Sequence, residues 1–177
     1  LKKDKITTGP VVEAFENKIK NYLKSKYSLV CNSGTSALFL ALKSIGIKKG
    51  DCIIMPSINF IASYNISKFF NAKVYLSDVS EMTGQTTPEK IIQCCKKFKI
   101  KKIKAIIVMY NSGYPENAEK FLELKKKYNC KIIEDACHAF GAKYKYKDKV
   151  FKIGSCRHSD ICTFSFHPLK TVTTGEG

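Results

Sequence analysis

The feature that most constrains the fold of this 177-residue chain is the alternation of short apolar runs with longer segments of helical periodicity. Helical segments separate most successive apolar runs, which favours parallel pairing because a parallel neighbour needs a long crossover connection. We therefore predict an α/β fold, a mainly parallel sheet with helices on both faces. The predicted strands are residues 27–31, 51–56, 72–79, 103–110, 130–136 and 159–166, and the predicted helices are residues 11–26, 32–47, 59–71, 87–98 and 115–129.

The helix starts carry their own signals. Thr87 followed by Pro88 is typical of an N-cap with proline at the first helical position. No internal repeat and no linker interrupts the pattern, so residues 1–177 are interpreted as one domain. Because parallel sheets bind ligands at the carboxyl ends of their strands, the residues just after each predicted strand are the candidates for a site.

The net charge of +16 comes from 30 lysines and one arginine, Arg157, against 15 acidic residues. The lysines follow helical polar faces and strand starts, which indicates a solvated surface. Sites that read bases or grip phosphates usually use arginine, so a nucleic-acid partner is not expected. An anionic substrate such as a nucleotide sugar would need only a few of these charges.

The cysteines and the apolar runs limit the setting of the protein. None of the eight cysteines forms a C-x-x-C pair, and no Cys/His cluster indicates a metal site, so we interpret the thiols as small apolar residues in a reducing compartment. No apolar run approaches the ~20 residues that cross a membrane, and the start has no signal-peptide core. The sequence predicts a cytoplasmic protein without membrane contact.

Small hydroxyl residues follow the first predicted strand. Residues 33–36 are Ser-Gly-Thr-Ser at the start of the next helix, where backbone N–H groups and the helix dipole favour an anion. Gly34 and Thr35 are the candidate phosphate-binding residues. The pattern matches neither the dinucleotide nor the P-loop motif, and its simplest alternative is an ordinary helix cap.

Two further groups follow the later strands. Asp135 ends the fifth run and His138 comes three residues on; the acid could bind a metal, position a base or pair with a cationic nitrogen, and the histidine could be structural. Ser165 and Lys170 follow the sixth run, where the lysine is isolated from the charged runs and its desolvated amine could form a Schiff base. A phosphate cradle, an anionic partner and an isolated amine together match pyridoxal phosphate (PLP). Phe60 could stack on its ring or belong to the core.

Five stretches of the sequence, taken in order along the chain, resemble the motifs of a known family. The stretches are ITTGPVVEAFENKIKNYL, VCNSGTSALFLAL, GDCIIMPSINFIASYN, IIEDACHAFGAKY and DICTFSFHPLKTVTTGEG. Together they resemble the DegT/StrS family of sugar aminotransferases, which have the large-domain fold of type I PLP enzymes. The resemblance covers essentially the whole chain, and the stretch around Lys170 is its most specific part.

The resemblance implies roles for the candidate residues. Lys170 would form the internal aldimine and later shuttle a proton, and Asp135 would pair with the pyridine nitrogen. His138 would lie near the phenolic oxygen of the ring and Phe60 would cover the ring. The phosphate would be held by three residues, Gly34, Thr35 and Ser165.

The resemblance also implies the reaction. An amino donor, usually glutamate, would load the cofactor, and the amine would pass to a keto group of a nucleotide-linked sugar, in the biosynthesis of surface polysaccharides or glycans. Relatives that dehydrate keto sugars have histidine in place of Lys170, so a PLP sugar dehydratase is the less favoured alternative. One departure concerns a histidine that many relatives have a few residues before the Gly-x-Pro turn. In this chain Tyr110 is the residue nearest to that position, so the substrate contacts of the loop stay open.

The length of the chain is the second departure. Family members continue for about another domain beyond GEG, including an antiparallel strand of the large-domain sheet and a small C-terminal domain, and they form homodimers with shared sites. Residues 1–177 would be an incomplete PLP-binding large domain and would be inactive alone. The sequence would be either a fragment of a longer protein or the product of a truncated gene. A non-catalytic remnant is therefore the alternative from another functional class, and a basic nucleic-acid-binding module is a third.

Overall fold

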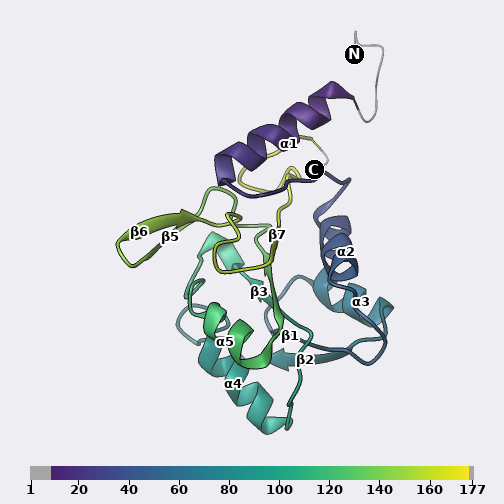
Figure 1. Ribbon diagram of the computed structural model, residues 1–177, viewed down its shortest axis with the longest axis vertical. Helices are drawn as coiled ribbons and strands as arrows, with labels where there is room; N and C mark the ends of the chain where they lie inside the picture. Colours follow the sequence, from purple (N-terminus) through teal and green to yellow (C-terminus); the bar gives the residue numbers. More distant parts are fainter. Residues whose placement is uncertain (1–8, 176–177) are drawn as a thin grey trace.

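A five-stranded parallel sheet forms the centre of the molecule (Figure 1). The computed structural model describes residues 9–175. The sheet has the strand order β2-β1-β3-β4-β7, and a two-stranded antiparallel hairpin, β5-β6, projects from it. The strands are β1 Cys52–Pro56, β2 Lys73–Ser77, β3 Ala105–Met109, β4 Lys131–Asp135, β5 Lys143–Tyr146, β6 Lys149–Lys152 and β7 Ile161–Thr163.

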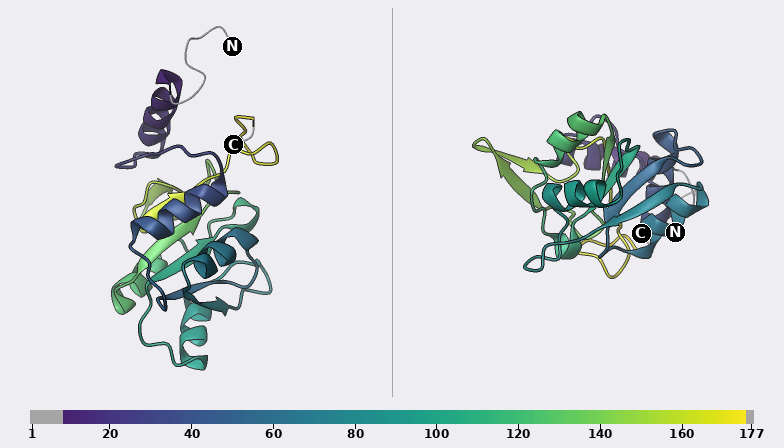
Figure 2. Two further views of the ribbon diagram at one scale, coloured as in Figure 1. Left: turned by 90° about the vertical axis from the view of Figure 1, so that its right-hand side faces the viewer. Right: turned by 90° about the horizontal axis from the view of Figure 1, so that it is seen from below.

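Helices cover both faces of the sheet, as the sequence predicted (Figures 1 and 2). Alternate residues of each strand point to opposite faces, so the sheet has two apolar clusters. Residues of α2 and α3 form one cluster, and residues of α4 and α5 form the other. The helices are α1 Pro10–Leu23, α2 Gly34–Ser44, α3 Ile61–Phe69, α4 Pro88–Lys97 and α5 Phe121–Tyr128, with a short 3-10 turn η1 at Asn111–Gly113.

The central strands read as continuous apolar runs because both of their sides are covered. All five residues of β3 are buried, and β3 pairs in parallel with β1 and with β4. Parallel pairing puts the carboxyl ends of all five strands at one edge of the sheet. The residues that come after the strands therefore meet at that edge.

Three parts of the fold differ from the sequence prediction. Residues 27–31 form no strand, although their composition favours one, because no strand lies beside them to pair with. The fifth helix starts at Phe121 and not at residue 115, because the intervening residues form turns. The hairpin of β5 and β6 was not predicted at all, although β5 alternates lysine with tyrosine, the pattern of a half-exposed strand, and Tyr144 is its buried residue.

Helix α1 stands apart from the sheet (Figure 2). Of the whole helix only Leu23 is buried. Residues 24–33 connect it to α2 as an irregular segment, in which Tyr27 is 75% exposed and Leu29 is 83% exposed. Exposed aliphatic and aromatic side chains of this kind mark a surface that has apolar area left to bury.

All eight cysteines are free thiols, as expected for apolar filler in this sequence. Of the residues described, no helix is long and apolar enough to span a membrane. Two stretches of the family resemblance, Ile6–Thr8 and Glu176–Gly177, lie outside the described residues.

The N-cap of α4 gives a direct test of the fold. The Thr87 hydroxyl accepts a hydrogen bond from the backbone N–H of Lys90, and Pro88 comes next at the first helical position. We expect Thr87→Ala to lower the free energy of unfolding by about 1 kcal/mol, because that N–H loses its acceptor. Urea denaturation measures the change. Thr87→Ser keeps the acceptor and is the matched control, and a loss of equal size in both variants would contradict the role of the cap.

Candidate functional site

The start of α2, the end of β4 and the segment after β7 meet at the carboxyl edge of the sheet. Their closeness is visible at Gly34, where an added Cβ would lie 3.1 Å from the Sγ of Cys137 and 3.1 Å from the Cβ of Ser165. A side chain at position 34 would fill this space. The structure therefore brings together two of the predicted phosphate-binding residues, Gly34 and Ser165, from segments 131 residues apart in sequence (165 − 34).

The start of α2 is capped by Ser33, and the predicted anion cradle would use the neighbouring backbone N–H groups. Ser33 is the N-cap, and its hydroxyl accepts a hydrogen bond from the backbone N–H of Ser36 at 3.1 Å. The backbone N–H groups of Gly34 and Thr35 come in the first turn, where a helix offers no internal acceptor. Thr35 is exposed and Gly34 is half-buried. The cap and the anion cradle, which were alternatives in the sequence, thus use different groups of one helix start.

Asp135 is the last residue of β4, and only 1% of it is exposed. One carboxylate oxygen accepts a hydrogen bond from the backbone N–H of Cys137 at 3.3 Å, and the other accepts one from the hydroxyl of Ser63 at 3.5 Å. Among the described residues no cationic side chain lies within 4.0 Å of this carboxylate. A buried acid without a counter-charge is a place where a cationic ligand group would be stabilised.

Lys170 lies in a turn that bends back over the same edge. Its backbone N–H donates to the carbonyl of His167, and the loop is closed by a hydrogen bond from the Thr174 N–H to the Phe166 carbonyl. The lysine is half-buried. Burial and the Lys170 ammonium lower the pKa of His138, while Asp135 opposes them, so the three side chains act on one another electrostatically.

The thiol of Cys137 lies between Asp135 and the start of α2. Its pKa is raised, first by burial and then by the charge of Asp135, so it stays a neutral thiol. From sequence this cysteine was interpreted as apolar filler, and its place in the site was not predicted. Ser63, which is fully buried on α3 and faces Asp135, was not predicted either. No spacing signal marks Ser63, whereas Cys137 comes close enough after Asp135 to have been a candidate.

Two aromatic residues near this edge differ in burial: Phe60 is exposed and Tyr110 is buried. Phe60 is 60% exposed at the start of α3, so it is not a core residue, and its backbone N–H points to the sulfur of Met109 at 3.4 Å. Tyr110 is 1% exposed, and its hydroxyl donates to Glu134. Tyr110 therefore does not line the site, and its departure from the family pattern does not bear on substrate contacts directly.

Within residues 9–175, no group of three or more His, Cys, Asp or Glu side chains is arranged to hold a metal ion. The ligand types at this edge are hydroxyls, backbone N–H groups, one buried carboxylate, the His138 imidazole, the neutral Cys137 thiol and one amine. This set suits an organic anion with a cationic ring better than a metal.

A family model described as the DegT/DnrJ/EryC1/StrS aminotransferase family matches residues 1–177. The chain belongs to this family. It is 39% identical over 169 residues to the GDP-perosamine synthase of Escherichia coli O157:H7, a match that covers 96% of this chain and 44% of that protein. It is 36% identical over 177 residues to a UDP-4-amino-4,6-dideoxy-N-acetyl-beta-L-altrosamine transaminase of Campylobacter jejuni, covering 100% of this chain and 45% of the relative. The chain thus spans less than half the length of these curated relatives.

Solved structures give the same assignment of the fold. An aminotransferase from Psychrobacter cryohalolentis superposes with a TM-score of 0.86 at 34% identity, covering 96% of this chain and 40% of that chain. The Bacillus subtilis protein NtdA with bound cofactor PMP superposes with a TM-score of 0.81 at 28% identity, covering 94% of this chain and 35% of NtdA. The predicted fold of a PLP-dependent transferase large domain is confirmed.

The crowding at Gly34 gives a test of the site geometry. We expect Gly34→Ala to lower the free energy of unfolding by about 1–3 kcal/mol, because the new methyl group overpacks the contact with Cys137 and Ser165. Thermal or urea unfolding measures the loss. Adding Cys137→Ala should recover part of it by removing one of the two crowding atoms. If Gly34→Ala lowers the free energy of unfolding by the same amount in the Cys137→Ala background as in the wild type, the contact with Cys137 is not the cause of the loss.

Proposed function

We propose that the chain is the cofactor-binding part of a PLP-dependent aminotransferase that moves an amino group to a keto group of a nucleotide-linked sugar. The observation that carries the proposal is the meeting of three groups at one edge: the α2 start, the buried Asp135 carboxylate and Lys170. Membership of the family and the names of its relatives support the substrate class. Three further parts of the proposal rest on the resemblance alone. They are glutamate as the amino donor, a homodimeric assembly, and a place in glycan biosynthesis.

The residues present fit PLP. Among the described residues the backbone N–H groups of Gly34 and Thr35 have no acceptor, so the first turn of α2 can bind a phosphate, and the close contact at Gly34 brings Ser165 to the same place. Asp135 offers a buried carboxylate without a protein counter-ion, which a protonated ring nitrogen would supply. Phe60 is exposed at the same edge and has a free face to cover a ring.

When bound, PLP supplies an aldehyde carbon that takes up amino groups and a ring that accepts electrons. Lys170 Nζ would attach the cofactor and, once released, would carry a proton to and from the reacting carbon. Asp135 would keep the ring nitrogen protonated, and its orientation comes from Ser63 and the Cys137 N–H. His138 is held neutral by burial and by Lys170, so it would serve as a hydrogen-bonding partner and not as a second cation.

Lys170 also favours transamination over the dehydratase alternative, because only an amine at this position can take part in proton transfer and amine exchange together. We expect the 177-residue chain alone to be inactive, since the resemblance places further site residues in a second subunit and a C-terminal domain.

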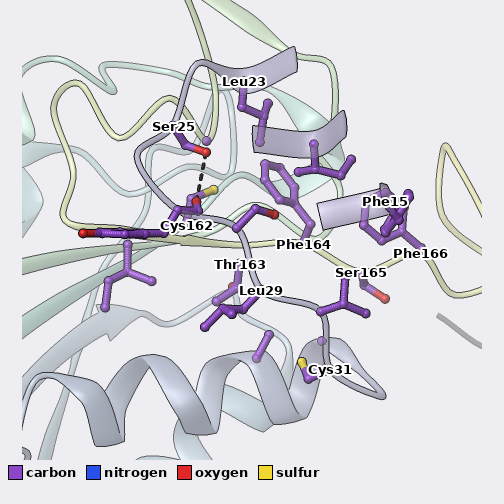
Figure 3. A pocket seen from close by; sticks show the side chains of 18 of the residues that line it. Phe15, Leu23, Ser25, Leu29, Cys31, Cys162, Thr163, Phe164, Ser165 and Phe166 are labelled. Atoms are coloured by element: carbon purple, nitrogen blue, oxygen red, sulfur yellow. Dashed lines mark hydrogen bonds between the residues drawn. The ribbon is translucent and has the colours of Figure 1, made fainter. Parts of the chain in front are cut away.

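We further propose that residues 1–177 are an incomplete large domain whose sheet lacks one strand. An apolar groove of about 680 Å³ lies between α1, residues 25–34 and the outer side of β7. Figure 3 shows side chains from all three, among them Leu23, Leu29 and Phe164, around this groove. β7 pairs only with β4, and residues 27–31 have a strand-like sequence without a neighbour. A strand antiparallel to β7 would satisfy both edges.

The identity of the cofactor lysine can be tested by absorbance. We expect protein mixed with PLP to show the visible band of lysine-bound cofactor, and Lys170→Ala to lose that band, because the variant lacks the amine that attaches the aldehyde. Lys147→Ala, an exposed lysine of the β5–β6 turn, is the matched control. A band that persists unchanged in Lys170→Ala would refute the assignment, and the band should persist in Lys147→Ala.

The missing strand can be tested with a chimera in which the C-terminal portion of the Escherichia coli O157:H7 GDP-perosamine synthase is joined after Gly177. Cys31 lines the groove, so we expect its reaction with a thiol reagent to slow at least about tenfold in the chimera as the groove fills. Cys52 lies in β1, away from the groove, and serves as the internal control. Equal labelling rates at Cys31 in both proteins would sink the proposal.

A further inference from the structure

Glu134 is a buried acid that the proposed chemistry does not use. It precedes Asp135 on β4, so its side chain points to the opposite face of the sheet, and 3% of it is exposed. Among the described residues no Lys, Arg or His nitrogen lies within 4.0 Å of its carboxylate. Burial raises its pKa, against hydrogen bonds led by that of Tyr110. An acid held in this way needs a reason in the structure around it.

Tyr110 attaches to the end of β4 at two points. Its hydroxyl donates to Oε1 of Glu134 at 2.7 Å, and its backbone N–H donates to the carbonyl of Asp135 at 3.2 Å. The tyrosine is 1% exposed, so both bonds are shielded from water. Hydrogen bonds in such a setting are stronger than those at a surface, and leaving one partner unsatisfied is correspondingly expensive.

The same residue begins the loop that faces the site. The main chain of Asn111 exchanges two hydrogen bonds with the buried Gln85 side chain, at 2.8 and 3.2 Å. At Gly113, with φ +80°, an added Cβ would lie 2.6 Å from the carbonyl oxygen of His138. The loop is therefore in close backbone contact with the segment that carries His138, and Tyr110 fixes where that loop starts.

β7 completes the arrangement from the other side. The Thr163 hydroxyl donates to the Glu134 carbonyl at 3.3 Å, and the Ala136 N–H donates to the Thr163 carbonyl at 2.9 Å. The strand end that carries Asp135 is thus held by β3 through Tyr110 and by β7 through Thr163. Two bonds between side chains act on this strand end, Tyr110 with Glu134 and Ser63 with Asp135, and of these the Tyr110–Glu134 bond links β4 to the residue that begins the neighbouring loop.

We propose that Tyr110 and Glu134 form a buried positioning pair, which holds the Asp135 carboxylate and the His138 segment in the geometry the site needs. The roles of Asp135 and His138 rest on the proposed function, whereas the rigidity that the pair confers does not. The pair also gives Tyr110 a structural role, since its hydroxyl is the donor to the buried Glu134 carboxylate.

Hydrogen exchange of backbone amides tests the pair in the 177-residue chain and in single-residue variants of it. We expect Tyr110→Phe to speed exchange of the amides of residues 111–114 and 136–138 about tenfold more than exchange in α4, because a local opening becomes easier. Tyr144→Phe is the matched control: it removes another buried tyrosine hydroxyl, which lies 2.6 Å from Nδ1 of His158. Glu134→Gln keeps an acceptor for Tyr110 and should stay near the wild-type pattern.

Two results would overturn the pair: equal acceleration in α4 and at the site in Tyr110→Phe, or the same site acceleration in Tyr144→Phe. Should Tyr110→Phe fail to fold, the wild type decides at two hydrogen-bonded site amides, those of Asn111 and Ala136. The pair requires these amides to be protected, and exchange at the rate of unprotected amides refutes it.

PLP titration adds a functional readout, with the Kd expected to rise about fivefold in Tyr110→Phe and to stay unchanged in Tyr144→Phe. A wild type that binds no PLP would count against the proposed function, while the exchange result would still judge the pair.

Discussion

The site depends on one row of the sheet, in which Met109, Asp135 and Thr163 are register partners on β3, β4 and β7. Each is the last residue of its strand, so the three chain segments leave the sheet at the same level. The residues after each strand are thereby forced into one place: Tyr110 and its loop, Cys137 with His138, and the segment that leads to Ser165 and Lys170. Parallel pairing creates this convergence without any contact among the functional side chains themselves.

The two sides of that row are not held equally. β4 has a partner on each side, and Asp135 is fixed by hydrogen bonds from several elements. β7 has a partner on one side only, and beyond it lies the apolar groove. The Lys170 turn that comes after β7 is held mainly by its own backbone bonds. The acid of the site is therefore rigidly placed, whereas the amine depends on what covers the outer side of β7.

Strand pairing also explains which elements could be predicted from the sequence and which could not. β1 and β3 were predictable because a parallel strand that is buried on both faces is apolar along its length, and β4 because Ile132 and Ile133 at its centre are apolar. Residues 27–31 have that composition too, yet composition alone does not provide a neighbouring strand, and pairing decides. The β5–β6 hairpin shows the reverse case, in which two short lysine-rich strands pair and the sequence signal is limited to the alternation of lysine and tyrosine in β5.

The site divides in a similar way. Gly34, Asp135, Ser165 and Lys170 could be found from sequence because each lies at or just after the end of an apolar run, so topology alone brings them together. Ser63, Glu134 and the inward direction of Tyr110 could not, since they depend on which face of an element a side chain occupies and on what packs against it. The resemblance leaves the substrate contacts of the loop after Tyr110 open. In the structure Tyr110 is buried against Glu134, so in the proposed pair it supports the site, and a change in such a support can alter the geometry of the site while every residue that touches the ligand stays the same.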